Sequence, residues 1–150
     1  MRMAIQGIGV VGGFGCGLSA LTQALAGKKV SPVYLPVRTH SGEVKLPVLQ
    51  AQTDLLENFI SKRALRRVDH FSRLALLGAY LALQDAEKKE SKERIGIIIA
   101  TGYGPSRTTF GFLDSMLDTD ITLASPTLFS NSVHNIAATN IAIRLGITGP

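Results

Sequence analysis

The sequence predicts an α/β fold, because two runs typical of buried strands alternate with segments of helical periodicity. The first run spans residues 3–11. The second spans residues 94–101, where IGIII is a continuous apolar stretch that fits a buried parallel strand. Two parallel strands cannot cover two buried helices, so we expect them to belong to a larger sheet.

The composition fits one globular domain. The chain has 150 residues, 45% of them hydrophobic, and a net charge of +5 that favours acidic partners. Cys16 is its only cysteine, which excludes an internal disulfide and favours a reducing compartment. The longest uncharged, largely apolar run near mid-chain, residues 74–83, is too short to span a bilayer. We therefore expect a cytoplasmic protein with no membrane contact.

In the N-terminal half, glycines follow the first run and predict a loop, and residues 18–27 predict a helix that ends at Gly27. Residues 30–48 carry three prolines and alternate around Ser41–Gly42, which predicts a peripheral hairpin. Residues 53–60 predict a short helix. Residues 61–89 predict the longest helical region, whose apolar middle, LALLGAYLAL, is typical of a helix between two layers.

In the C-terminal half, residues 108–117 predict a helix and residues 118–126 a loop. Residues 131–145 predict a helix that Gly146 closes and that Asn131 or Ser132 caps. Asn135 and Asn140 lie on this otherwise apolar helix. We expect them to form hydrogen bonds across an interface.

Residues 7–12, GIGVVG, match the glycine pattern of dinucleotide-binding loops, in which a helix N-terminus binds pyrophosphate. The next helix is predicted to begin near Leu18, which is too late for that role. The first carboxylate of the chain is Glu43, so no acid stands about 20 residues on to bind a ribose. A flexible turn after a strand is the better interpretation, and we expect no cofactor.

A basic cluster opens the longest helical region: Lys62, Arg63, Arg66, Arg67 and Arg73. Arg63, Arg66 and Arg67 have the spacing of one helix face. Cations near a helix N-terminus oppose the macrodipole, which favours a docking role over a stabilising one. A solvated surface, an acidic protein and a nucleic acid are the alternatives. The chain has no tryptophan and few aromatics nearby, so nucleic acid is the weakest of the three.

No catalytic set stands out in the sequence. Cys16 lies among glycines with no base beside it, and His40, His70 and His134 are too scattered to indicate a metal site. Asp114, Asp118 and Asp120 lack the alternation with glycine of a calcium loop.

Four motifs, in order, resemble the β-ketoacyl synthases: GIGVV, RRVDHFSRLAL, RIGIIIATGYG and SPTLFSNSVHNIAATNIAIRLGITGP. This family catalyses decarboxylative condensation of acyl and malonyl thioesters in fatty-acid or polyketide synthesis. The resemblance implies a thiolase-like layered sandwich, with residues 1–150 as the first part of its N-terminal half. It also implies that the nucleophilic cysteine follows Gly149-Pro150 by a short strand, so we expect this chain alone to be inactive.

The resemblance implies roles for six residues. Arg63, Arg66 and Arg67 match positions that dock the acyl carrier protein, although Thr122-Leu123-Ala124 stands where the family often has further basic residues. Tyr103 matches the acyl-pocket gate and is larger than the usual aliphatic side chain, while Leu128 and Val133 match positions that reach the neighbouring subunit's pocket. We expect a homodimer or association with a ketosynthase subunit, built on the Asn131–Leu145 region, including Asn135.

Two further functions stay open from the sequence. One is a non-catalytic ketosynthase-like partner of the chain-length-factor type, which would give dimer and carrier contacts. The other, weaker, is a small nucleotide-binding α/β domain.

Overall fold

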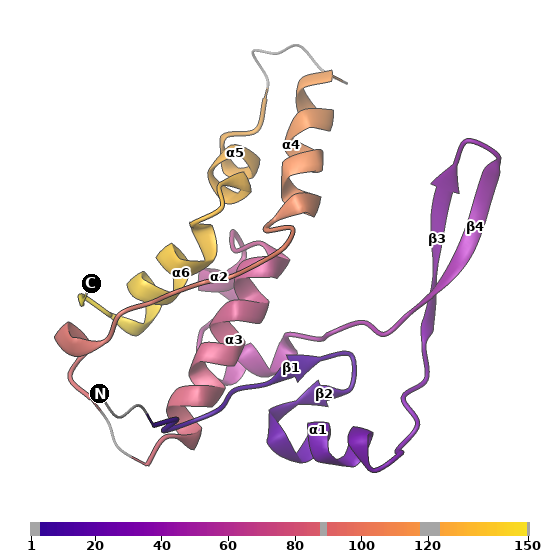
Figure 1. Ribbon diagram of the computed structural model, residues 1–150. Helices are drawn as coiled ribbons and strands as arrows, with labels where there is room; N and C mark the ends of the chain where they lie inside the picture. Colours follow the sequence, from indigo (N-terminus) through magenta and orange to yellow (C-terminus); the bar gives the residue numbers. More distant parts are fainter. Residues whose placement is uncertain (1–3, 88–89, 118–123, 150) are drawn as a thin grey trace.

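The computed structural model describes residues 4–87, 90–117 and 124–149 (Figure 1). It confirms a mixed α and β chain, although its strands are not those that the sequence predicts. In chain order the elements are β1 (Val11–Gly12), β2 (Gly15–Cys16), α1 (Gly17–Leu25), β3 (Val33–Thr39), β4 (Gly42–Val48), the 3₁₀ helix η1 (Asp54–Asn58), α2 (Lys62–Leu65), α3 (His70–Asp85), the 3₁₀ helix η2 (Lys92–Arg94), α4 (Ser106–Leu117), α5 (Pro126–Ser132) and α6 (Ile136–Leu145).

Helix α3 forms the centre of the core and packs against α6 (Figure 1). Leu76 and Leu77 on α3 are fully buried, and the cluster also contains Ile141 on α6, Leu56 in η1, Leu65 and Val68. Burial of each such side chain contributes about 1.5–3 kcal/mol. The apolar middle of the longest helix is thus buried, as its lack of a polar face indicates.

The predicted strand over residues 3–11 is wrong in its pairing. Residues 4–10 run beside α3 without a strand partner among the described residues, and only Val11 and Gly12 enter a ladder, with β2. Ile5 is 82% exposed. The segment is bonded to the end of α3 and not to a neighbouring strand, because the Asp85 Oδ2 accepts a hydrogen bond of 2.9 Å from the Ile8 amide.

The predicted buried strand over residues 94–101 is also wrong as a strand. Residues 95–100 have no strand partner among the described residues, and Ile97 and Ile99 pack on the core while Ile98 between them is 96% exposed. The alternation has the period of a strand with one covered face. A continuous apolar run predicts burial on both faces, and no described residue covers the second face.

The described strands form two antiparallel pairs, β1 with β2 and β3 with β4, in place of the expected parallel sheet. The second pair confirms the predicted hairpin. Its register places Val37 opposite Val44 and Thr39 opposite Gly42, so that His40 and Ser41 form the turn. The hairpin extends away from the helices (Figure 1).

Two helices that the sequence predicts as continuous are each divided. The region predicted over residues 61–89 contains α2 and then α3, which ends at Asp85, because the Asp69 carboxylate accepts from the Ser72 amide and caps a new helix. Residues 88–89 lie outside the described residues. Residues 131–145 belong to α5 and α6, which break at residues 133–135. Ser125 caps α5, so the predicted capping role of Asn131 or Ser132 is wrong.

The remaining predictions agree more closely with the structure. Helix α1 ends before Gly27, which has a φ of 91°, and Gly146 closes α6 with a φ of 65°. Helix α4 covers residues 108–117, and residues 53–60 contain a 3₁₀ helix. Residues 118–123 of the predicted loop lie outside the described residues, and α5 begins at Pro126. Within the described residues, no helix is both long and apolar enough to cross a membrane.

Candidate functional site

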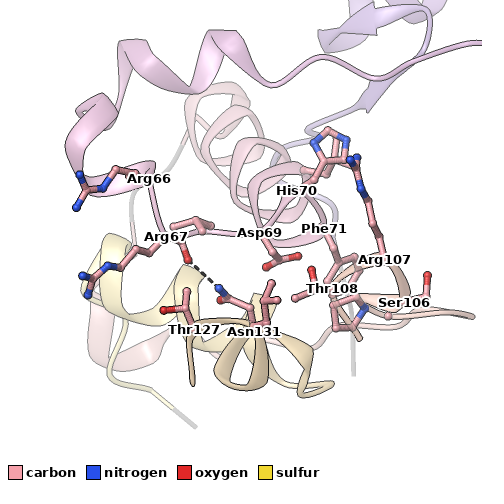
Figure 2. A pocket seen from close by; sticks show the side chains of 15 residues that line it. Arg66, Arg67, Asp69, His70, Phe71, Ser106, Arg107, Thr108, Thr127 and Asn131 are labelled. Carbon is pink, nitrogen blue, oxygen red and sulfur yellow. Dashed lines mark hydrogen bonds between the residues drawn. The ribbon is translucent and has the colours of Figure 1, made fainter. Parts of the chain in front are cut away.

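A groove of about 500 Å³ lies where three segments distant in the sequence meet (Figure 2). The first is the junction of α2 and α3, residues 66–71. The second is the approach to α4 and its first residues, 104–108, and the third is α5, which contributes Thr127, Leu128 and Asn131. The groove therefore joins two predicted carrier-docking arginines, Arg66 and Arg67, with the predicted pocket residue Leu128.

The sharp turn between α2 and α3 places the arginines at the groove. Ser61 caps α2 through the Ala64 amide, and Asp69 caps α3. Arg73 then stabilises the turn, because its Nε donates to the Val68 carbonyl at 3.0 Å and its Nη2 donates to the Leu65 carbonyl at 2.7 Å. Arg73 belongs to the predicted basic cluster, but its guanidinium is used within the chain.

Because of this turn, the predicted arrangement of Arg63, Arg66 and Arg67 on one helix face is wrong. Arg63 lies in α2, whereas Arg66 and Arg67 lie between the helices, so the three do not share one continuous helix face. Arg66 and Arg67 line the groove. Arg63 instead lines a neighbouring depression with Glu57, Lys62, Arg66 and Arg73.

Asn131 connects α5 to the arginine turn. Its side chain is buried, and its Nδ2 donates a 2.9 Å hydrogen bond to the carbonyl of Arg67 (Figure 2). The predicted interface residue thus has an intramolecular partner. Asn135 follows between α5 and α6, is exposed, and forms no side-chain cap bond.

Helices α4 and α5, which provide two of the three walls of the groove, pack on each other. Phe112 and Phe129 have ring centroids 5.4 Å apart. The hydroxyl of Thr109 lies 3.3 Å from the carbonyl of Pro105 and 3.5 Å from that of Ser132, so it joins the two helices. These contacts position Leu128 on the groove side.

Tyr103 and Val133 do not line the groove. Tyr103 is 88% exposed on the turn before α4, where the Thr101 hydroxyl accepts from its amide at 3.3 Å. Val133 is exposed after the end of α5. The structure therefore brings one of the three predicted pocket residues, Leu128, to the groove.

Arg107 and His70 are groove residues that the sequence reasoning missed. Figure 2 shows them together at one end, with Arg66 and Arg67 at the other. Arg107 is the only cation of α4 and stands 34 residues beyond Arg73, outside any charge cluster. Only the path of the chain brings it there, so no local pattern could have indicated it.

Positive charge dominates the groove. Among the described residues that line it, Asp69 is the one acidic residue, and one oxygen of that carboxylate already caps α3. Among the described residues, ion pairs join Lys62 to Glu57 and Arg94 to Glu90, and none involves Arg66, Arg67 or Arg107. Three guanidinium groups are thus available to an anionic partner, and guanidinium binds carboxylates and phosphates well.

The only thiol lies elsewhere. Cys16 follows β1 in the small N-terminal hairpin, and its Sγ lies 3.9 Å from the carbonyl of Gln52. Burial raises the pKa of this thiol above its ordinary value, which lowers its thiolate fraction. No group of three metal-ligating side chains occurs among residues 4–87, 90–117 and 124–149.

These features define a mixed α/β domain with a cationic groove between helices. Residues 3–150 match the family described as beta-ketoacyl synthase, N-terminal domain, and the chain belongs to that family. The resemblance of its four motifs is thereby confirmed.

Two curated relatives carry the same name. The chain is 29% identical over 98 residues to 3-oxoacyl-[acyl-carrier-protein] synthase 2 of Staphylococcus aureus, which is 63% of this chain and 24% of that protein. It is 27% identical over 95 residues to the protein of that name in Synechocystis sp., covering 61% and 23%. The matched stretch thus spans about a quarter of the length of these relatives.

Proposed function

We propose that this chain is the N-terminal portion of a β-ketoacyl-acyl-carrier-protein synthase-like protein and that its cationic groove docks the acidic acyl carrier protein. The observation that carries this proposal is the meeting of Arg66, Arg67 and Arg107 at one groove with no ion-pair partner among the described residues. Opposite charges guide an acidic partner to such a surface and orient it there.

The activity of the whole protein is decarboxylative condensation of acyl and malonyl thioesters in fatty-acid synthesis. The membership of the family and the printed names of the relatives support it. The layered thiolase-like arrangement follows the same reasoning. In it, residues 4–10, which lie against α3, and residues 95–100, which lie beside α3 and α6, would pair as strands.

The chain by itself is proposed to lack condensing activity. The family reaction needs an activated thiolate, and burial of Cys16 favours the neutral thiol instead. The hydrogen-bond partner of the Cys16 thiol is the Gln52 carbonyl, and none of the described histidines forms a hydrogen bond with it. Turnover of malonyl thioester by the purified 150-residue chain would contradict this part of the proposal.

We propose that Tyr103 is the gate of the acyl pocket and that Leu128 and Val133 reach the acyl pocket of a neighbouring subunit. The exposure of Val133 leaves its side chain open to that neighbour. The bulk of Tyr103 would limit chain length. In the full-length protein, Tyr103→Ile should shift acyl preference toward longer chains, and an unchanged preference would remove Tyr103 from the gate.

A binding titration tests carrier docking. We expect a labelled acidic acyl carrier protein to bind the chain saturably, and added salt to weaken the binding because the contacts are exposed charges. Charge reversal at both Arg66 and Arg67 should reduce affinity about tenfold or more.

Arg38→Glu combined with Lys45→Glu on the exposed hairpin is the matched control, because this pair changes the net charge equally outside the groove. A single-stranded oligonucleotide provides the competing class of partner. Equal weakening by the control variant, or tighter binding of the oligonucleotide than of the carrier, would contradict the proposal.

A further inference from the structure

The groove is charged on two separate walls. Arg66 and Arg67 come from the turn before α3, and Arg107 comes from the second residue of α4. The third wall, α5, has no charged side chain, since no Asp, Glu, Lys or Arg occurs between Asp120 and Arg144. Within the part of the chain that the structure describes, Arg107 is therefore the only full positive charge that faces the groove from outside the arginine turn.

The stability of α4 does not explain an arginine at this position. A cation in the first turn of a helix opposes the macrodipole, and the first turn of α4 has no acidic residue to offset it. Arg107 is exposed and has no ion-pair partner among the described residues. Its guanidinium is thus available for contacts outside the chain.

We infer that Arg107 is a second docking residue for the acyl carrier protein, binding an acidic side chain across the groove from those that Arg66 and Arg67 bind. This inference rests on the proposed carrier docking. Two cations on one turn attract an acidic surface but leave it free to rotate about that turn. A third cation on another element restricts this rotation and orients the partner.

The positive charge opposite the arginine turn comes from a single residue, Arg107. The sequence has Thr122-Leu123-Ala124 before α5, so that segment supplies no positive charge. Arg107 lines the groove that α5 helps to form (Figure 2). The positive charge on this side of the groove thus comes from Arg107 at the start of α4, and not from the segment before α5.

The test is the affinity of an acidic acyl carrier protein without its prosthetic group, measured by fluorescence anisotropy at low ionic strength with the 150-residue chain. Four variants are compared: Arg107→Glu, Arg107→Lys, Arg66→Glu and the hairpin control Arg38→Glu. Far-UV circular dichroism checks that each is folded. We expect Arg107→Glu to weaken binding about three- to tenfold and to flatten the salt dependence, with Arg107→Lys close to the unsubstituted chain.

The outcomes separate the inference from the function on which it rests. If Arg66→Glu weakens binding while Arg107→Glu binds like Arg38→Glu, carrier docking stands and the role of Arg107 is overturned. If neither groove variant differs from the control, both are overturned. If Arg107→Lys is as weak as Arg107→Glu, the residue acts by shape and not by charge, which also overturns the inference.

Discussion

The side-chain amide of Asn131 donates a 2.9 Å hydrogen bond to the backbone carbonyl of Arg67, 64 residues away. This bond joins α5 to the turn that presents the groove arginines. The amide is buried, so its loss leaves the Arg67 carbonyl short of a partner at a site with little access to water. The geometry of the groove therefore depends on a residue that carries no charge.

Replacement of Asn131 should lower stability and loosen the groove. We expect Asn131→Ala to reduce the free energy of unfolding by about 1–3 kcal/mol, because a buried hydrogen bond is lost. Urea unfolding measures the change. Ser130→Ala is the neighbouring control, since Ser130 is exposed and bonds only within its own helix, and it should stay within about 0.5 kcal/mol. Equal changes in the free energy of unfolding for Asn131→Ala and Ser130→Ala would show that the hydrogen bond between Asn131 and Arg67 does not stabilise the chain.

Two glycines should respond in opposite directions to alanine. A Cβ at Gly9 would collide with the backbone of Gly78 in α3, so Gly9→Ala should cost about 1–3 kcal/mol. Gly111 within α4 has open space around it, and Gly111→Ala should stabilise the chain by about 0.5–1 kcal/mol. Thermal or urea unfolding of both variants tests the packing of residues 4–10 on α3. A neutral Gly9→Ala would contradict that packing.

The thiol of Cys16 should be unreactive and should link stability to pH. Burial raises its pKa in the folded chain, so the folded state holds this proton more tightly than the unfolded state does. The stability that this provides is complete below the unfolded pKa and is lost as pH rises through the folded pKa. Alkylation by iodoacetamide should be slower than that of a free thiol at the same alkaline pH. A rate equal to that of glutathione would contradict the account.

The chain is predicted to associate through the region from residue 131 to residue 145. Ile143 on α6 is 74% exposed, and large exposed apolar side chains mark surfaces that bind partners. Light scattering at micromolar concentration should give a dimer, and Ile143→Asp should give a monomer. Leu25→Asp on α1 is the control, because Leu25 is 80% exposed outside this region. A monomeric unsubstituted chain would overturn the prediction.

Local patterns predicted the elements of this chain better than their boundaries and partners. The hairpin, α1, α4 and the closure of α6 at Gly146 follow from turn glycines and periodicity. The break before α3 does not, because Asp69 becomes a helix cap only through the path that Arg73 and Asn131 stabilise. The sequence also does not predict that Ile98 is exposed, because a continuous apolar run does not indicate which of its two faces is left uncovered.

The sequence predicts one part of the candidate site, the arginine cluster, and gives no indication of another part, Arg107 and His70. The cluster around Arg66 and Arg67 indicated an anion-binding surface by its density, but the role of Arg73 as a structural donor was not apparent. Arg107 and His70 reach the groove by tertiary placement, and sequence spacing carries no signal of that kind.

Hydrogen–deuterium exchange in the presence and absence of an acidic acyl carrier protein tests the central claim most directly, because it locates the contact on the chain. Docking at the groove predicts slower exchange in peptides that cover residues 66–71, 104–108 and 127–131, with no change in the hairpin from residue 33 to residue 48. Protection of the hairpin with the groove unchanged would contradict it.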